Sequence, residues 1–199
     1  MTRHFKPIVT LLFLALLAWG CTDTSRNNDH AAIPLPPAYV RIEPFKADYI
    51  STGQSGFEAN RYADATVTQK ENGIEWITLA YKQFGATLHV SYHPGLSQEK
   101  AEEMWLNRID RMRINSGGRQ SEILTADTPA GWNLSILITP QGSPTPVQFV
   151  ATGMRDGKPA ILTGGVNLGI TPASADSISP VIRMFTRDII HAVNAMPYD

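Results

Sequence analysis

Apolar and polar residues alternate in short runs through the first half of the chain, and a period of two predicts β-strands. The strands expected from this alternation are 39–42, 57–62, 65–68, 74–81 and 86–92. Asn72-Gly73 lies between two of these runs, and this dipeptide favours the tight turn of a β-hairpin. The sequence therefore predicts an antiparallel β-structure up to residue 92.

The period changes after Pro94-Gly95, where apolar residues recur at spacings of three and four and predict a helix from Ser97. The residues expected on its apolar face are Ala101, Met104, Trp105, Ile109 and Met112. Acidic residues gather at its start and arginines at its end, which complements the helix dipole. Asn115-Ser-Gly-Gly118 is expected to end it.

Strand patterns return in the second half of the chain, at 120–125, 132–139, 147–152 and 160–166. The Pro- and Gly-rich stretch 140–146 predicts a turn, and 155–158 predicts the turn of another hairpin. A last helix is expected from Ser179-Pro180, a cap and first-turn pair, to Met196. Its expected apolar face is Ile182, Phe185, Ile189, Val193 and Met196. Such a mixture of strands and helices predicts the α+β class, with a mostly antiparallel β-sheet covered by helices and a C-terminal amphipathic helix.

The N-terminal stretch changes this picture, because it has the layout of an export signal. Arg3 and Lys6 precede an apolar run from Ile8 to Ala18, which is too short to span a bilayer and ends just before Gly20-Cys21. Cys21 is the only cysteine. We expect residues 1–20 to be a signal peptide and Cys21 to be lipidated, with an ordinary signal peptide and an incidental cysteine as the open alternative.

The rest of the chain suits a tether and one globular domain. Residues 21–37 are polar and then Pro-rich, which is typical of a flexible linker, and 38–199 is the length of a single domain. Loss of Arg3 and Lys6 with the leader gives a net charge of about −3. This charge argues against a nucleic-acid binder.

Candidate catalytic and metal-binding patterns are weak. Thr52-Gly-Gln-Ser-Gly56 lacks the residue that a nucleophile elbow places between its serine and second glycine. His89 and His93 share a face of a predicted strand but would lie roughly 13 Å apart, and no third ligand has zinc-like spacing. The glycine-rich run 163–169 lacks the lysine of a phosphate loop and is interpreted as a strand end with close backbone approach. We therefore expect no catalytic residues, no metal and no cofactor.

One surface remains as a candidate for binding a partner. Arg183, Arg187 and His191 align on the last predicted helix, on a different side from its apolar face. Such a row is usually a solvated helix face, and its alternative role is to dock an acidic partner. Asp176 begins the segment that contains the row, and we include it in the candidate partner-binding surface.

Several segments together resemble a known family. They are Tyr39-Val-Arg41, 75–81, 86–92, 147–152 and above all 176–190, with its Asp-Ser-Ile-Ser-Pro start and its Asp-Ile-Ile end. In these segments the chain resembles the gliding-motility lipoprotein D family (GldD) of Bacteroidetes. Ser55-Gly56 stands where we associate a cysteine-containing patch with that family, and Gly153-Met154 stands where a more polar pair is usual.

The resemblance implies a non-enzymatic lipoprotein that supports gliding motility and the type IX secretion machinery by touching other envelope proteins. It also implies a single GldD-like domain, similar to the α/β/α sandwich of the photosystem II extrinsic protein P (PsbP). We expect a lipid anchor in the outer membrane, facing the periplasm, and no nucleic-acid partner. A lipid-anchored small-ligand binder or hydrolase is the alternative, and a chaperone with an exposed apolar patch is a third possibility.

Overall fold

The computed structural model describes residues 43–169 and 175–197, with the side chains of 175–177 excepted. Within these residues lie nine strands, two α-helices and two single-turn 3₁₀ helices. In chain order they are β1 (Tyr49–Thr52), β2 (Phe57–Asn60), β3 (Asp64–Gln69), η1 (Glu71–Gly73), β4 (Glu75–Tyr81), η2 (Lys82–Phe84), β5 (Ala86–His93), α2 (Gln98–Ser116), β6 (Glu122–Asp127), β7 (Asn133–Ile138), β8 (Val147–Arg155), β9 (Lys158–Leu168) and α3 (Ala175–Ala195).

A seven-stranded sheet is the centre of the fold. Its strand order is β3-β4-β5-β9-β8-β7-β6, and every neighbouring pair is antiparallel. The strands β1 and β2 form a separate two-stranded ribbon. The expected α+β class, with an antiparallel sheet, covering helices and a C-terminal amphipathic helix, is confirmed.

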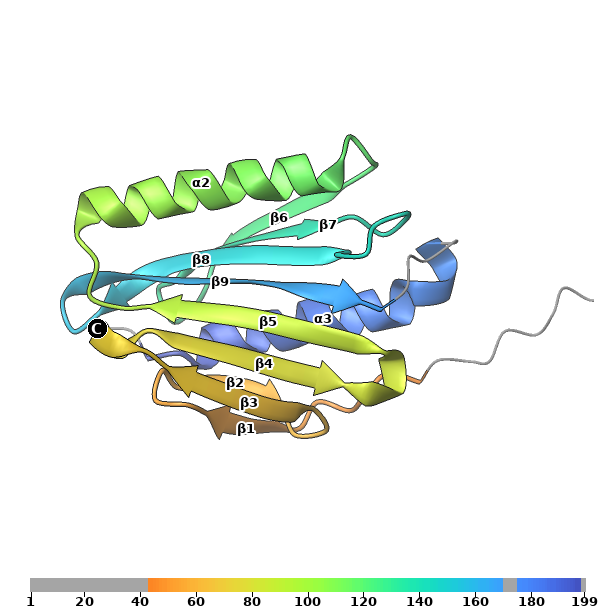
Figure 1. Cartoon of the computed structure of the whole chain (residues 1–199), viewed down its shortest axis with the longest axis horizontal. Helices are drawn as coiled ribbons and strands as arrows, with labels where there is room; N and C mark the ends of the chain where they lie inside the picture. The colour runs from red at the N-terminus through yellow and green to blue at the C-terminus, as the bar shows by residue number, and fades with distance from the viewer. Residues whose placement is uncertain (1–42, 170–174, 198–199) are drawn as a thin grey trace, which may run out of the picture. The chain divides into compact units, whose positions relative to one another are not determined.

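The two faces of the large sheet carry different helices (Figure 1). Helix α3 and the β1–β2 ribbon pack on one face, and α2 packs on the other, over β8 and β9. On the α3 side, alternate strand residues and the apolar face of α3 form the main core, which includes Trp132, Phe149 and Phe185. A smaller cluster around Ala101, Met112 and Ile161 lies under α2. Since α2 covers only part of its face, no helix of the described residues lies over the same face of β3, β4 and β5.

The first helix follows the sequence closely. Ser97 caps α2 by accepting a hydrogen bond from the backbone N–H of Lys100, and Gly117 ends it in the left-handed conformation. Of its predicted apolar face, Ala101 and Met112 are buried, while Met104, Trp105 and Ile109 pack against them half-buried. These expectations are confirmed because caps and periodicity are local properties of the chain.

The last helix departs from its expected start. Helix α3 begins at Ala175, so Ser179 is not its cap and Pro180 lies inside it. Pro180 is the sixth residue of the helix, and it lacks the N–H that would donate to the carbonyl four residues earlier, so one helical hydrogen bond is lost there. The predicted apolar face is confirmed, since Ile182, Phe185, Ile189, Val193 and Met196 are all buried.

Two further local expectations concern a turn and a glycine-rich run. Asn72 and Gly73 both have positive φ, as the predicted tight turn between β3 and β4 requires. The close approach predicted for the glycine-rich run is confirmed, because a Cβ on Gly164 would lie 2.4 Å from the carbonyl oxygen of His89. The run covers the C-terminal half of β9 and ends one residue past Leu168, the last residue of that strand, so the predicted strand end is confirmed as well. The expected strand 39–42 lies outside the described residues.

Candidate functional site

The first candidate is the basic row predicted on the last helix, and its residues have different environments in the structure. Arg183 is exposed, and its guanidinium donates a short hydrogen bond to the Ser179 hydroxyl one turn earlier. Arg187 and His191 instead each contact a carboxylate of this chain, Arg187 that of Asp188 on the same helix and His191 that of Glu58 in β2. The side chain of Asp176 lies outside the described residues. Binding of a partner by these four residues stays a prediction.

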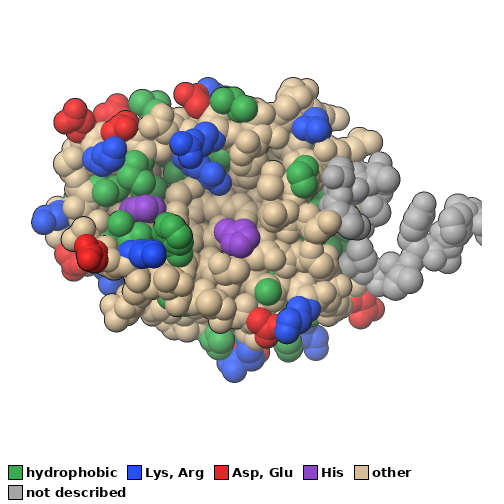
Figure 2. Space-filling model, in the orientation of Figure 1, with side chains coloured by type: hydrophobic (Ala, Val, Ile, Leu, Met, Phe, Trp, Pro, Cys, Tyr) green, Lys and Arg blue, Asp and Glu red, His purple; other side chains and the backbone are tan. Residues whose placement is uncertain are grey.

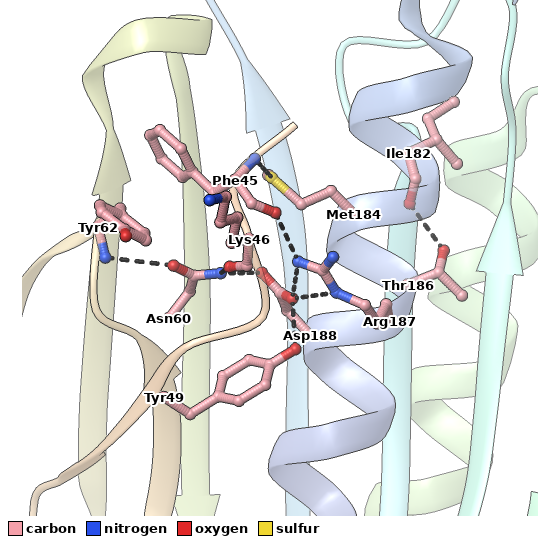
Figure 3. A network of polar contacts seen from close by, with 10 residues as sticks. All are labelled: Phe45, Lys46, Tyr49, Asn60, Tyr62, Ile182, Met184, Thr186, Arg187 and Asp188. Carbon is pink, nitrogen blue, oxygen red and sulfur yellow. Dashed lines mark hydrogen bonds and ion pairs between the residues drawn. The ribbon is translucent and has the colours of Figure 1, made fainter. Parts of the chain in front are cut away.

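Asp188, next to Arg187, is the centre of a polar network that joins α3 to the ribbon (Figure 3). Its side chain is only 4% exposed. One carboxylate oxygen accepts hydrogen bonds from the Tyr49 hydroxyl at 2.8 Å and from Arg187 at 2.8 and 2.9 Å. The other accepts the Asn60 side-chain amide at 3.0 Å. A buried carboxylate with this many donors is fully compensated, which indicates a structural role.

The remaining atoms of this network reach the segment before β1. Arg187 also donates to the carbonyl of Phe45 at 3.0 Å, and Asn60 donates to the carbonyl of Lys46 at 3.1 Å. Beside them, the ring of Tyr49 stacks on His191 with centroids 3.6 Å apart, and His191 contacts Glu58 at 2.7 Å. His191 therefore holds the ribbon against α3, and Arg187 holds the segment before the ribbon.

The pKa shifts of two nearby tyrosines agree with a structural role for this cluster. Burial raises the pKa of Tyr49, and its hydrogen bond to Asp188 raises it further. Burial also raises the pKa of Tyr81, with the charge of Asp188 adding to the effect. Both phenols therefore stay protonated, and Tyr49 can only donate to the carboxylate.

The weak elbow-like pattern forms the turn between β1 and β2. There the backbone N–H groups of Gln54 and Ser55 donate to the two oxygens of buried Glu75, at 2.6 and 3.0 Å. Burial by itself raises the pKa of Glu75, but hydrogen bonds from Ser55, Gln54 and Gln69 outweigh it and hold that pKa below its ordinary value. Ser55 is 2% exposed and does not line the groove that contains His89 and His93. This arrangement stabilises a turn.

His89 and His93 line a groove of about 590 Å³ beside α2, on the open part of the sheet. Figure 2 shows histidines and basic side chains gathered on this face. Burial lowers the pKa of His93, which is therefore neutral at pH 7. His89 is exposed and its ring nitrogen lies 3.3 Å from the Thr78 hydroxyl. No group of three or more potential metal ligands occurs in the parts of the chain that the structure describes.

The wall of this groove comes from α2 and contains residues that the sequence did not single out. Lys100, Met104, Arg108 and Arg111 line it, at spacings of four, four and three that place them on one helix side. Arg108 donates to the backbone carbonyl of Gly164 at 2.7 Å. In the sequence, the arginines at the end of this helix indicate only a complement to the helix dipole. Their shared side with Lys100, next to the apolar face, is the signal that could have found them.

Among the residues described, no helix has the length and apolar character needed to cross a membrane.

The fold and these sites define the class of the protein, an α+β domain in three layers. Its most complete polar cluster has a structural role, and its open groove is cationic. The model of a family described as gliding motility lipoprotein GldD matches residues 29–198, so the chain belongs to that family. It is thus a gliding motility lipoprotein of the cell envelope. Comparisons with curated proteins and with solved structures gave no match.

Proposed function

We propose that this lipoprotein is an accessory, scaffold-like component of the gliding motility and type IX secretion machinery, and that it acts through contacts with other envelope proteins without a reaction of its own. The observation that carries the proposal is the family match over residues 29–198. The closed polar network around Asp188 supports it, because such a network builds a stable platform.

The anchor in this proposal is Cys21, acylated after removal of residues 1–20, on the periplasmic face of the outer membrane. Several acyl chains on one residue make attachment effectively permanent. Mass analysis of the mature N-terminus tests this step. We expect a mass increase equal to the acyl groups, and membrane release of a Cys21→Ser variant. A soluble wild-type protein with a free thiol would contradict the anchor.

The contact surface in this proposal is the outer side of α3. Arg183, Ile190 and Asn194 are exposed and lie at helical spacings of seven and four, so they share this side. Arg187 borders them but is committed to Asp188. Arg183 has no ion-pair partner among the described residues, and Ile190 lies about two turns further along the same side. These two residues fit a partner with an acidic group at the edge of an apolar patch.

Affinity capture of the native protein from envelopes, followed by identification of the captured proteins, tests the function. We expect motility and secretion components among them, and recovery reduced by about tenfold for Arg183→Glu. Arg113→Glu is the matched control, because Arg113 is exposed on α2 on the opposite face of the sheet.

Equal recovery with the wild type, the Arg183→Glu variant and the control would remove this surface from the proposal. Capture of no motility or secretion protein with any of them would remove the function itself.

A further inference from the structure

The groove beside α2 carries more positive charge than the protein balances. Lys100 pairs with Glu103 at 2.8 Å, but Arg108 and Arg111 have no acidic partner among the described residues. On the opposite face of the sheet, Arg187 is paired with a carboxylate. The same chain thus neutralises one half-buried arginine and leaves another without a counter-charge.

Arg108 shows this imbalance most clearly. It is half-buried, and one terminal nitrogen donates to the carbonyl of Gly164 at 2.7 Å. Its Nε is buried and has no hydrogen-bond partner among the residues described. Burial lowers the pKa of Arg108, and the like charge of Arg111 lowers it further. Charged groups held out of water usually have a charged partner, whereas the hydrogen bond that the structure gives this guanidinium goes to an uncharged backbone carbonyl.

Glycines in β9 let this arginine reach the floor of the groove. Gly165 faces the α2 side, and a Cβ there would lie 3.7 Å from the Arg108 guanidinium. A larger side chain at Gly165 would fill the space in which the guanidinium and its ligand must lie. The site is therefore formed by the backbone of β9 as well as by α2.

The strand residues of the groove are neutral and rich in hydrogen-bonding groups, while Lys100 and Glu103 line it from α2 as an ion pair. Ser91, Thr163 and His93 line it, and the buried Thr163 hydroxyl has no partner among the described residues. Trp76 is 54% exposed, lies at the groove and offers apolar surface. Hydroxyls, a neutral imidazole and an aromatic ring suit a hydroxylated ligand, and a volume of about 590 Å³ suits a small one.

We propose that this groove binds the carboxylate or phosphate group of a small hydroxylated ligand, such as an acidic sugar or a polyol phosphate. Arg108 and Arg111 bind the anionic group, and the hydroxyl-bearing strand residues bind the remainder. Arginine suits this role because its planar guanidinium pairs with the two oxygens of such groups. The inference goes beyond the scaffold function and does not depend on it.

Titration calorimetry on the full-length protein in a non-ionic detergent tests the proposal. The probes are glucuronate and glycerol 3-phosphate, with glucose and glycerol as their neutral counterparts. We expect the anionic probes to bind with dissociation constants on the order of 1 mM or tighter, and the neutral ones about tenfold more weakly. Tighter binding of glucuronate indicates an acidic glycan as the source, and tighter binding of glycerol 3-phosphate indicates a lipid headgroup.

Variants locate the binding. Arg108→Gln and Arg111→Gln are each expected to weaken the anionic probes by about tenfold, because each removes one charged partner. Arg113→Gln is the control, since it removes the same charge from the same helix outside the groove. Arg111 is exposed, so its variant keeps the test valid if Arg108→Gln fails to fold.

Two results would overturn the proposal. One is equal binding of anionic and neutral probes to the wild-type protein. The other is a loss of affinity for Arg113→Gln as large as that for the two groove variants.

Discussion

The two faces of the seven-stranded sheet treat charge in opposite ways. On the α3 face, the buried Asp188 carboxylate accepts hydrogen bonds from Tyr49, Asn60 and Arg187. On the α2 face, Arg108 and Arg111 line a groove and have no acidic partner among the described residues. A paired charge on one face and an unpaired charge on the other suggest a division between stability and binding.

The packing of apolar side chains also differs between the two faces of the sheet. The α3 face carries the main core, where Trp132, Phe149 and Phe185 are fully buried. The α2 face carries a small cluster in which Met104, Trp105 and Ile109 are only partly buried. Most of the free energy of folding should therefore come from the α3 face, and changes on the α2 face should be tolerated better.

The largest expected effect compares one aromatic residue from each helix. Phe185→Ala removes a fully buried ring from the main core, and we expect a loss of about 3–5 kcal/mol in the free energy of unfolding. Trp105→Ala removes a half-buried ring, and we expect about 1–2 kcal/mol. Urea unfolding of both variants measures the difference. Equal losses would show that the two faces contribute alike.

The next effect compares two acidic residues. Asp188→Ala leaves the Tyr49 hydroxyl and the Asn60 amide without their acceptor and Arg187 without its counter-ion, so we expect a loss of about 2–3 kcal/mol. Asp110→Ala on α2 breaks only an exposed pair with Arg113 at 3.8 Å, and we expect less than about 0.5 kcal/mol. Urea unfolding decides between them, and a small loss for Asp188→Ala would refute the structural role of its network.

How far the sequence predicts this fold depends on the distance between interacting residues. The capped ends and apolar face of α2 and the Asn72-Gly73 turn follow from neighbouring residues, and they were predicted. Strand β1 was not predicted, because it is short, mostly exposed and depends on Glu75 to hold the turn that follows it. Local patterns do not contain that information.

The candidate sites were harder to predict than the fold, because they bring together residues that are far apart in the sequence. Spacing placed Arg183, Arg187 and His191 on one side of a helix, but it could not tell that Tyr49, 139 residues before Asp188, lies across from them. The groove arginines were visible in the sequence as a row on α2. What made them a candidate site was the half of the sheet beside them that no described helix covers, which is a property of the tertiary fold.

Two neighbouring glycines in β9 allow the packing on the two faces of the sheet to be compared directly. A Cβ on Gly164 would lie 2.4 Å from a backbone oxygen and 2.6 Å from the ring of Phe149, so we expect Gly164→Ala to cost about 1–2 kcal/mol. A Cβ on Gly165 meets its nearest atom at 3.4 Å, on the α2 side, and Gly165→Ala should change stability by less than about 0.5 kcal/mol. Thermal unfolding of the two variants tests this. A similar shift in both melting temperatures would contradict the tighter packing of the α3 side.

The smallest effect uses pH to separate the faces. Burial lowers the pKa of His93 below its ordinary value of 6.5, so its contribution to stability is present above that pH and is lost as the pH falls toward the folded-state pKa. Glu75 also has a lowered pKa, because its hydrogen bonds outweigh burial, and its contribution is lost only as the pH falls below about 4.5. Melting temperatures measured from pH 7.5 to 3 should therefore fall in two stages. His93→Gln should reduce only the fall at the higher pH, and Glu75→Gln only the fall at the lower pH. A single variant that reduces both falls would contradict this assignment of one titrating residue to each face.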